Sequence, residues 1–245
     1  MVLHYQVRGE GPPLFLLHGL AGSSRWWARN IEALSGSHRV YALDLPGYGG
    51  LRRSRGDFVL AAGAEWLLRA IDFLEPGVPV SLMGHSMGAL VCAMLAASEV
   101  GRVDRLVLAA PAMDLQGRTI AASLWPLARA CGASPLSFWP TLVSDSARAG
   151  PGLLLRSARE LFAMDGRRNL HSIRAPTLLV WGERDALIPV SLAAGLQGEI
   201  AGSDLVVIPG AGHVVMWDAA EQFNRVVLAF FGTAQGKPWA NTYKS

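Results

Sequence analysis

Short apolar runs recur along the chain, and several of them end at a glycine, a proline or an aspartate. The first run roughly alternates apolar and polar residues, which predicts a leading strand. The six later runs are apolar at consecutive positions, which is typical of strands buried on both faces of a parallel sheet. The seven predicted strands cover residues 3–9, 13–19, 38–47, 78–86, 104–111, 176–185 and 204–213.

Helical patterns fill the intervals between these runs. A serine opens residues 23–34 as a cap, and an aspartate opens residues 57–75. Residues 86–98 follow a buried strand directly, and residues 218–232 are amphipathic and end at a glycine. Repeated strand–helix units predict an α/β fold, with a mostly parallel, doubly wound sheet that has helices on both faces.

The alternation stops between residues 113 and 173. This stretch has helical patterns at 119–130 and 151–164 and no convincing strand pattern. We therefore predict three parts: an α/β core of residues 1–112 and 174–235, a helical cap, or lid, at residues 113–173, and a flexible tail at residues 236–245.

Composition narrows the classes of partner. Hydrophobic residues make up 51% of the chain and charged residues only 17%, which is enough apolar surface for one large core. The net charge of +3 comes from scattered arginines, so no nucleic-acid partner is expected. The first residues lack the pattern of a signal peptide, and the apolar residues 14–17 are too few to cross a bilayer. We expect a cytoplasmic monomer or homodimer without stable membrane insertion.

The sharpest chemical signal is a G-x-S-x-G pattern from Gly84 to Gly88, placed between a predicted strand and a predicted helix. A turn this tight strains the backbone at Ser86 and requires neighbours without bulk, which the two glycines supply. Ser86 would then stand at a helix N-terminus, where negative charge is favoured. This context indicates a nucleophile.

A serine hydroxyl needs a base, and the base needs a carboxylate. His213 follows the last predicted strand, in a glycine-rich loop at the carboxyl end of the sheet, where such sheets build their sites. Asp185 follows the preceding strand and completes the expected chain order. Glu183 and Asp114 are the alternative carboxylates.

An acyl-transfer site also needs donors for the oxyanion. The glycine-rich loop after the second predicted strand supplies the amide of Leu20, and the start of the helix after Ser86 supplies the amide of Met87. His18, which ends that strand, is expected to brace the loop through hydrogen bonds.

These segments together resemble the α/β-hydrolase fold family, in order and over roughly residues 2–232. The resemblance is carried by His18-Gly19, Asp44 to Gly49, Gly84 to Gly88, Gly182 to Asp185 and Gly210 to His213. It implies Ser86, Asp185 and His213 as a catalytic triad, the Leu20 and Met87 amides as the oxyanion hole, and the insertion as a cap domain. It requires no metal and no organic cofactor. The chain departs from the family pattern at Gly50, where a serine commonly follows the turn, and this change puts no catalytic role in doubt.

Cleavage of small carboxylic esters with short to medium acyl chains is the activity that these residues favour. The substrate pocket is expected at the cap. The predicted lining residues are the aromatic side chains of the cap and of the loops beneath it: Trp26, Trp125, Phe138, Trp139, Phe162 and Trp217.

Two alternatives stay open. A C–C bond hydrolase or an enol-lactonase has the same triad, and arginines of the cap would then hold a carboxylated substrate. The candidate arginines are Arg118, Arg129, Arg148, Arg156 and Arg159. A catalytically silent binding protein on the same fold would instead have a Ser86 that does not react.

Overall fold

The computed structural model describes residues 2–52 and 59–232. Asp57, the residue predicted to open a helix, and the predicted tail at residues 236–245 lie outside the described residues. No helix within the described ranges is both long enough and apolar enough to cross a membrane.

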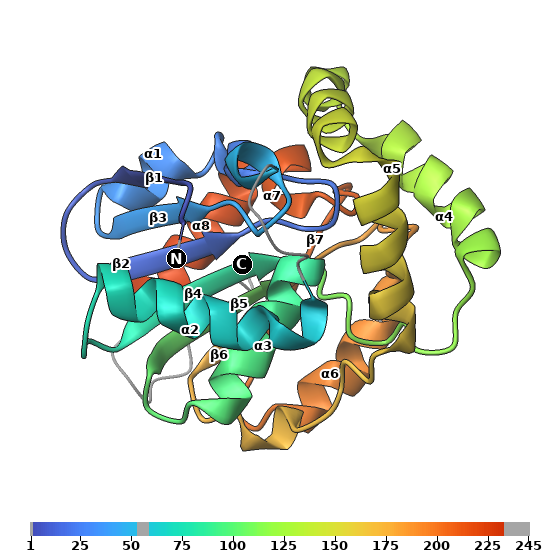
Figure 1. The fold of residues 1–245 in the computed structure, drawn as a ribbon. Coiled ribbons are helices and arrows are strands. Elements are labelled where there is room, and N and C mark those ends of the chain that lie inside the picture. The colour runs from blue at the N-terminus through green and yellow to red at the C-terminus, as the bar shows by residue number, and fades with distance from the viewer. Residues whose placement is uncertain (1, 53–58, 233–245) are drawn as a thin grey trace.

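A seven-stranded sheet forms the centre of the molecule, in the order β1-β3-β2-β4-β5-β6-β7 (Figure 1). The strand β1 is antiparallel to β3, and every other neighbouring pair is parallel. The strands are β1 (Tyr5–Arg8), β2 (Pro13–Leu17), β3 (Arg39–Leu43), β4 (Val80–His85), β5 (Val103–Ala109), β6 (Thr177–Gly182) and β7 (Asp204–Ile208). The predicted doubly wound, mostly parallel sheet is confirmed.

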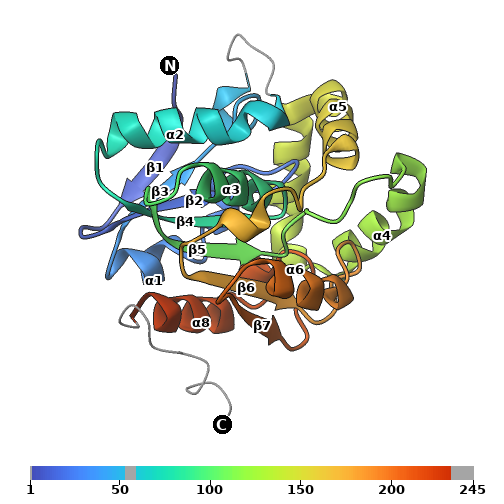
Figure 2. The ribbon, with the colours of Figure 1, turned by 90° about the horizontal axis from the view of Figure 1, so that it is seen from below.

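Helices cover both faces of this sheet, as Figure 2 shows with α2 and α3 on one side and α1 and α8 on the other. The helices of the first face are α2 (Gly63–Leu74), α3 (Met87–Ser98) and α6 (Ala193–Glu199), and those of the second are α1 (Ile31–Ser35), α7 (Val215–Asp218) and α8 (Ala220–Gly232). Short 3₁₀ turns complete the connections: η1 (Ser24–Trp27), η2 (Gly49–Leu51), η3 (Leu60–Ala62), η5 (Leu170–Ser172) and η6 (Val190–Leu192).

The alternation of side chains along β2 shows how the strands divide the core. Phe15 and Leu17 belong to the cluster under α2 and α3, whereas Leu14 and Leu16 belong to the cluster under α1 and α8. All four are fully buried. A strand with apolar residues at consecutive positions therefore fills both cores at once, because successive side chains point to opposite faces.

Some predicted elements differ in the structure. The strand β7 ends the order of the sheet, and four of its five residues are half-buried or exposed, with Ile208 buried. Residues 23–34 form η1 and the start of α1 instead of one helix. Hydrogen bonds fix the chain at Asn30, whose side-chain amide donates to the Met216 carbonyl at 3.0 Å and to Asn224 Oδ1 at 2.8 Å.

The segment between β5 and β6 contains α4 (Ile120–Ala133), η4 (Leu136–Phe138) and α5 (Trp139–Ala163), which we call the cap helices. They lie beyond the carboxyl ends of the strands (Figure 1). The helix α5 is kinked at Gly150, whose φ of 76° is not helical and which precedes Pro151. The division of the chain into a core and a cap domain stays a prediction.

The close contact between α3 and β2 leaves no room for a side chain at Gly88. A Cβ on Gly88 would lie 2.5 Å from the carbonyl oxygens of Leu17 and His18. We expect Gly88→Ala to lower the free energy of unfolding by about 1–3 kcal/mol, measured by urea denaturation. Gly198→Ala is the control, because it lies on an exposed part of α6 with no atom near the added Cβ, and it should be neutral or stabilising. Equal stability of wild type and Gly88→Ala would contradict the close approach.

Candidate active site

Ser86 stands in the turn from β4 to α3 with a strained backbone, at φ 53° and ψ −114°. Its N–H donates to the Ala109 carbonyl at 2.9 Å, and its own carbonyl accepts from the Ala112 N–H at 3.2 Å. A Cβ on Gly84 would lie 2.5 Å from the backbone of Ala89, so the first turn of α3 folds back closely on β4. The hydroxyl is thereby presented at the N-terminus of α3.

His213 lies in the loop after β7 and brings its ring to Ser86. The distance from His213 Nε2 to Ser86 Oγ is 3.3 Å, and His213 Nδ1 lies 2.8 Å from Asp185 Oδ2. The other Asp185 oxygen accepts from the backbone N–H groups of Leu187 and Ile188, at 2.9 and 2.8 Å. An ionised carboxylate only accepts, so Nδ1 carries the proton and Nε2 has its lone pair toward Ser86.

The two alternative carboxylates lie elsewhere. Glu183 is exposed, and its Oε2 accepts from the Gly210 N–H at 2.9 Å. Asp114 Oδ2 lies 3.8 Å from a nitrogen of Arg167. Among the three carboxylates considered from the sequence, Asp185 is the one that contacts His213.

His85 supports the backbone of the proposed base, a role that the sequence did not reveal. Its Nε2–H donates to the His213 carbonyl at 2.9 Å, and the two rings lie 4.8 Å apart. The side chain is fully buried. Burial, reinforced by the neighbouring His213, holds the pKa of His85 well below its usual value, so the ring is neutral.

The loop predicted to supply an oxyanion donor lies directly against Ser86. A Cβ on Gly19 would approach Ser86 Cβ to 3.1 Å. His18 braces this loop from below: its Nε2 accepts from the Leu45 N–H at 3.0 Å, and its Nδ1–H donates to the Gly19 carbonyl at 2.8 Å. Complete burial lowers the pKa of His18 despite the nearby Asp44, which favours the neutral ring that these two bonds require.

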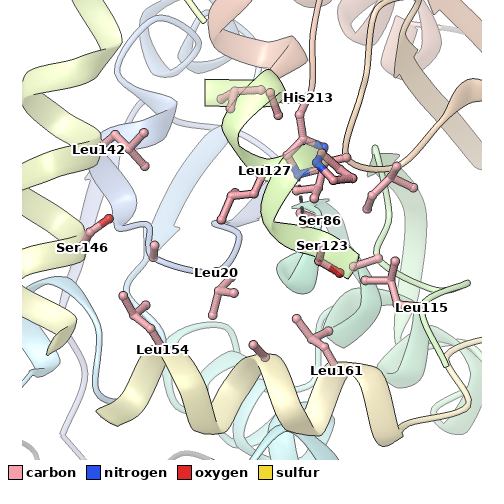
Figure 3. A pocket seen from close by; sticks show the side chains of 18 of the residues that line it. Leu20, Ser86, Leu115, Ser123, Leu127, Leu142, Ser146, Leu154, Leu161 and His213 are labelled. Carbon is pink, nitrogen blue, oxygen red and sulfur yellow. Dashed lines mark hydrogen bonds between the residues drawn. The ribbon is translucent and has the colours of Figure 1, made fainter. Parts of the chain in front are cut away.

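A cavity of about 510 Å³ lies between Ser86 and the cap helices, within the usual size range of small-molecule sites. Figure 3 shows Ser86 and His213 on one side of it and Leu142 and Ser146 on the other. Its wall is mainly aliphatic, with leucines from the core and from both cap helices: Leu20, Leu115, Leu127, Leu142, Leu154 and Leu161. Of these leucines, only Leu20 was indicated by the sequence, and only for its backbone amide.

Three of the six aromatic residues predicted to line the pocket do so: Trp26, Phe138 and Phe162. The other three do not. Trp125 and Trp139 are 73% and 38% exposed, and neither belongs to the lining of the cavity. Trp217 is buried behind the wall, with its ring 5.0 Å from that of Phe138 and below the Arg29 guanidinium.

Charged groups are scarce at this cavity. Of the five candidate arginines, Arg118 belongs to the wall, and its Nη1 lies 3.4 Å from the Leu187 carbonyl. Within the described residues there is no group of three or more His, Cys, Asp and Glu side chains that could hold a metal ion.

Asp218 is a further residue that the sequence analysis missed, because its position before an amphipathic pattern is typical of a helix cap. Its Oδ2 accepts from the Gly212 N–H at 3.0 Å, beside His213. Burial raises the pKa of Asp218 to about 6, although the Gly212 N–H and His213 act in the opposite direction.

Comparison with known proteins identifies the family of this chain. The model of a family described as the alpha/beta hydrolase family matches residues 14–226. The chain belongs to the alpha/beta hydrolase family. The resemblance carried by the sequence motifs is therefore confirmed.

This hydrolase has curated relatives with several activities. It is 36% identical over 250 residues to the dihydrolipoyllysine-residue acetyltransferase component of an acetoin cleaving system from Pseudomonas putida. The aligned region covers 92% of this hydrolase but only 65% of that relative. It is 28% identical to a pimeloyl-acyl-carrier protein methyl ester esterase from Nitrosomonas europaea, with 90% and 96% of the two chains covered.

A solved structure gives the same fold. The esterase from Exiguobacterium antarcticum superposes with a TM-score of 0.82 at 21% identity, covering 94% of this hydrolase and 96% of that chain. At this identity the likeness is one of fold.

The raised pKa of Asp218 predicts how the stability of this hydrolase depends on pH. The carboxyl is protonated up to about pH 6 when folded but only to about pH 4 when unfolded. Its contribution to stability is therefore full below about pH 4 and is lost as the pH rises through 6. Asp218→Asn keeps an oxygen for the Gly212 N–H and removes this loss.

We expect the free energy of unfolding of Asp218→Asn, relative to that of the wild type, to rise by about 1–2 kcal/mol from acidic to neutral pH. Urea denaturation of both proteins at pH 4 and pH 7.5 measures the difference. The same difference at both pH values would show that Asp218 ionises normally.

Proposed function

We propose that this hydrolase cleaves carboxylic esters with short to medium acyl chains, through an acyl-enzyme on Ser86. The observation that carries the proposal is the continuous hydrogen-bonded series Asp185–His213–Ser86 at the wall of a mainly apolar cavity. A hydroxyl joined to a base, and a base joined to a carboxylate, is the arrangement that activates serine as a nucleophile.

The first half of the reaction forms the acyl-enzyme. His213 Nε2 removes the Ser86 proton as Oγ attacks the ester carbonyl carbon, and Asp185 stabilises the imidazolium that results. The amides of Leu20 and Met87 hold the oxyanion, helped by the N-terminus of α3. When the tetrahedral intermediate collapses, the alcohol leaves with the proton from His213.

The second half returns the free enzyme. His213 takes a proton from a water molecule, whose oxygen attacks the acyl carbon, and the carboxylic acid leaves as Ser86 regains its proton from His213. His85 acts as a positioning residue here, because its bond to the His213 carbonyl fixes the backbone from which the base projects.

The wall of the cavity supports an apolar acyl group as its occupant. The side chains opposite Ser86 are largely aliphatic, and Leu142 and Leu154 come from α5 (Figure 3). An acyl chain that starts at Ser86 and extends toward α5 would exchange water for these side chains, which is favourable in proportion to the area buried.

Hydrolysis of p-nitrophenyl esters from acetate to palmitate tests the nucleophile. We expect turnover of the shorter esters by the wild type and a loss of at least about 10⁴-fold in kcat in Ser86→Ala. Ser98→Ala is the matched control, since this hydroxyl at the end of α3 donates to the Leu95 carbonyl away from the cavity. Equal activity of Ser86→Ala and wild type would contradict the proposal.

A pair of neighbouring positions tests where the acyl chain lies. Leu142 lines the cavity, whereas Val143 is 57% exposed and does not. We expect Leu142→Trp to move the optimum of the ester series to chains shorter by roughly two to four carbons, because it fills the end opposite Ser86. Val143→Trp should leave the optimum in place. An unchanged optimum in both variants would put the acyl chain elsewhere.

Arg118 supports one alternative activity, because it is a cationic side chain at the wall of the cavity. A C–C bond hydrolase or an enol-lactonase with the same triad would use it to hold a substrate carboxylate. Failure of every simple ester, with Ser86 still labelled by a fluorophosphonate, would favour this alternative. If no ester is hydrolysed and the fluorophosphonate does not label Ser86 either, a catalytically silent binding protein would be favoured.

A further inference from the structure

Exposed apolar side chains are concentrated on the cap helices. The described part of the chain has fourteen large hydrophobic residues with exposed side chains, and six of them lie between residues 125 and 155. They include Leu136, which is 86% exposed, and Trp125, which is 73% exposed. The helix α4 stands at the edge of the molecule, apart from the sheet, in both Figure 1 and Figure 2. Such a concentration on one part of a folded chain marks an interaction surface.

The same helices carry positive charge without exposed negative charge to balance it. Arg129, Arg148 and Arg159 are exposed on α4 and α5. The two acidic residues of these helices are Asp145 and Glu160: Asp145 is fully buried in a pair with Arg25, and Glu160 is half-buried and accepts from the Leu60 N–H. A surface that combines tryptophan and leucine with arginine is complementary to an anionic lipid surface, which is apolar below its charged headgroups.

This surface is continuous with the cavity. Leu127 and Leu155 both line the cavity, yet their side chains are 46% and 41% exposed. Pro151 also lines the cavity and is exposed. The apolar wall that begins at Ser86 therefore reaches the outside between α4 and α5, so a lipid-dissolved molecule would enter the cavity without crossing bulk water.

We propose that the outer surface of the cap helices docks peripherally on anionic lipid surfaces, so that the mouth of the cavity opens onto the lipid. Its apolar part consists of Trp125, Leu127, Leu136, Trp139, Val143 and Leu155. No helix inserts across the bilayer in this arrangement. The docking does not depend on the proposed ester hydrolysis, because binding to lipid needs no turnover.

Co-sedimentation with vesicles tests the docking. The vesicles contain phosphatidylcholine alone, or phosphatidylcholine with about one third phosphatidylglycerol. We expect the wild type to bind the mixed vesicles, and to bind weakly at high salt or to phosphatidylcholine alone, because the attraction to the arginines is screened or absent. The double variant Leu136→Ser/Val143→Ser should bind the mixed vesicles about tenfold more weakly.

A matched double variant controls for the loss of exposed apolar surface in general. Phe73 and Val100 are 73% and 64% exposed and lie on the core, away from the cap helices. Phe73→Ser/Val100→Ser should bind the mixed vesicles as the wild type does. Both double variants should hydrolyse a dissolved short ester like the wild type, because none of the four residues belongs to the cavity wall.

Three results would overturn the docking. The wild type could fail to bind the mixed vesicles, or the two double variants could bind them equally well. A change from dimer to monomer in Leu136→Ser/Val143→Ser, without vesicle binding by the wild type, would instead make the surface an interface between two copies of this chain. If the wild type binds the mixed vesicles but hydrolyses no ester, only the proposed function would be contradicted.

Discussion

The turn at Ser86 requires α3 to approach β4 and β2 more closely than side chains normally allow. Glycines at positions 84 and 88 make the approach feasible, since a Cβ at either one would lie 2.5 Å from backbone atoms. The strain at Ser86 is held by its bonds to the Ala109 and Ala112 backbone. Because β2 and β4 are neighbours at the centre of the sheet, the same approach brings the loop after β2 against Ser86.

The remaining site residues come from loops, and each loop is anchored by a buried bond. Asp185 is fixed by two backbone N–H groups of its own turn, and His213 is held by His85 on one side and by the Gly212–Asp218 bond on the other. All these loops leave the carboxyl ends of parallel strands, which meet at one edge of the sheet. The geometry therefore depends on the sheet order, and the cap helices contribute cavity wall rather than members of the hydrogen-bonded series.

The sequence predicted the features that follow from local rules. Strands buried on both faces are apolar at consecutive positions, and a serine between two glycines after such a strand can stand only in a tight turn. The cap was harder to predict, because its helices carry apolar side chains on more than one side. Trp125 faces solvent while Leu127, two residues later, lines the cavity, and no local pattern distinguishes them. The role of His85 depends on a contact with a residue 128 positions away.

We propose that Ser86, activated by His213, is the reactive nucleophile of this hydrolase. Labelling of the folded protein with a fluorophosphonate, followed by peptide mapping, tests it most directly. We predict one label per chain on the peptide that contains Ser86, and a much slower reaction in His213→Ala, which removes the base. A folded wild-type protein that stays unlabelled at Ser86 would contradict this proposal. So would a His213→Ala variant that is labelled as fast as the wild type.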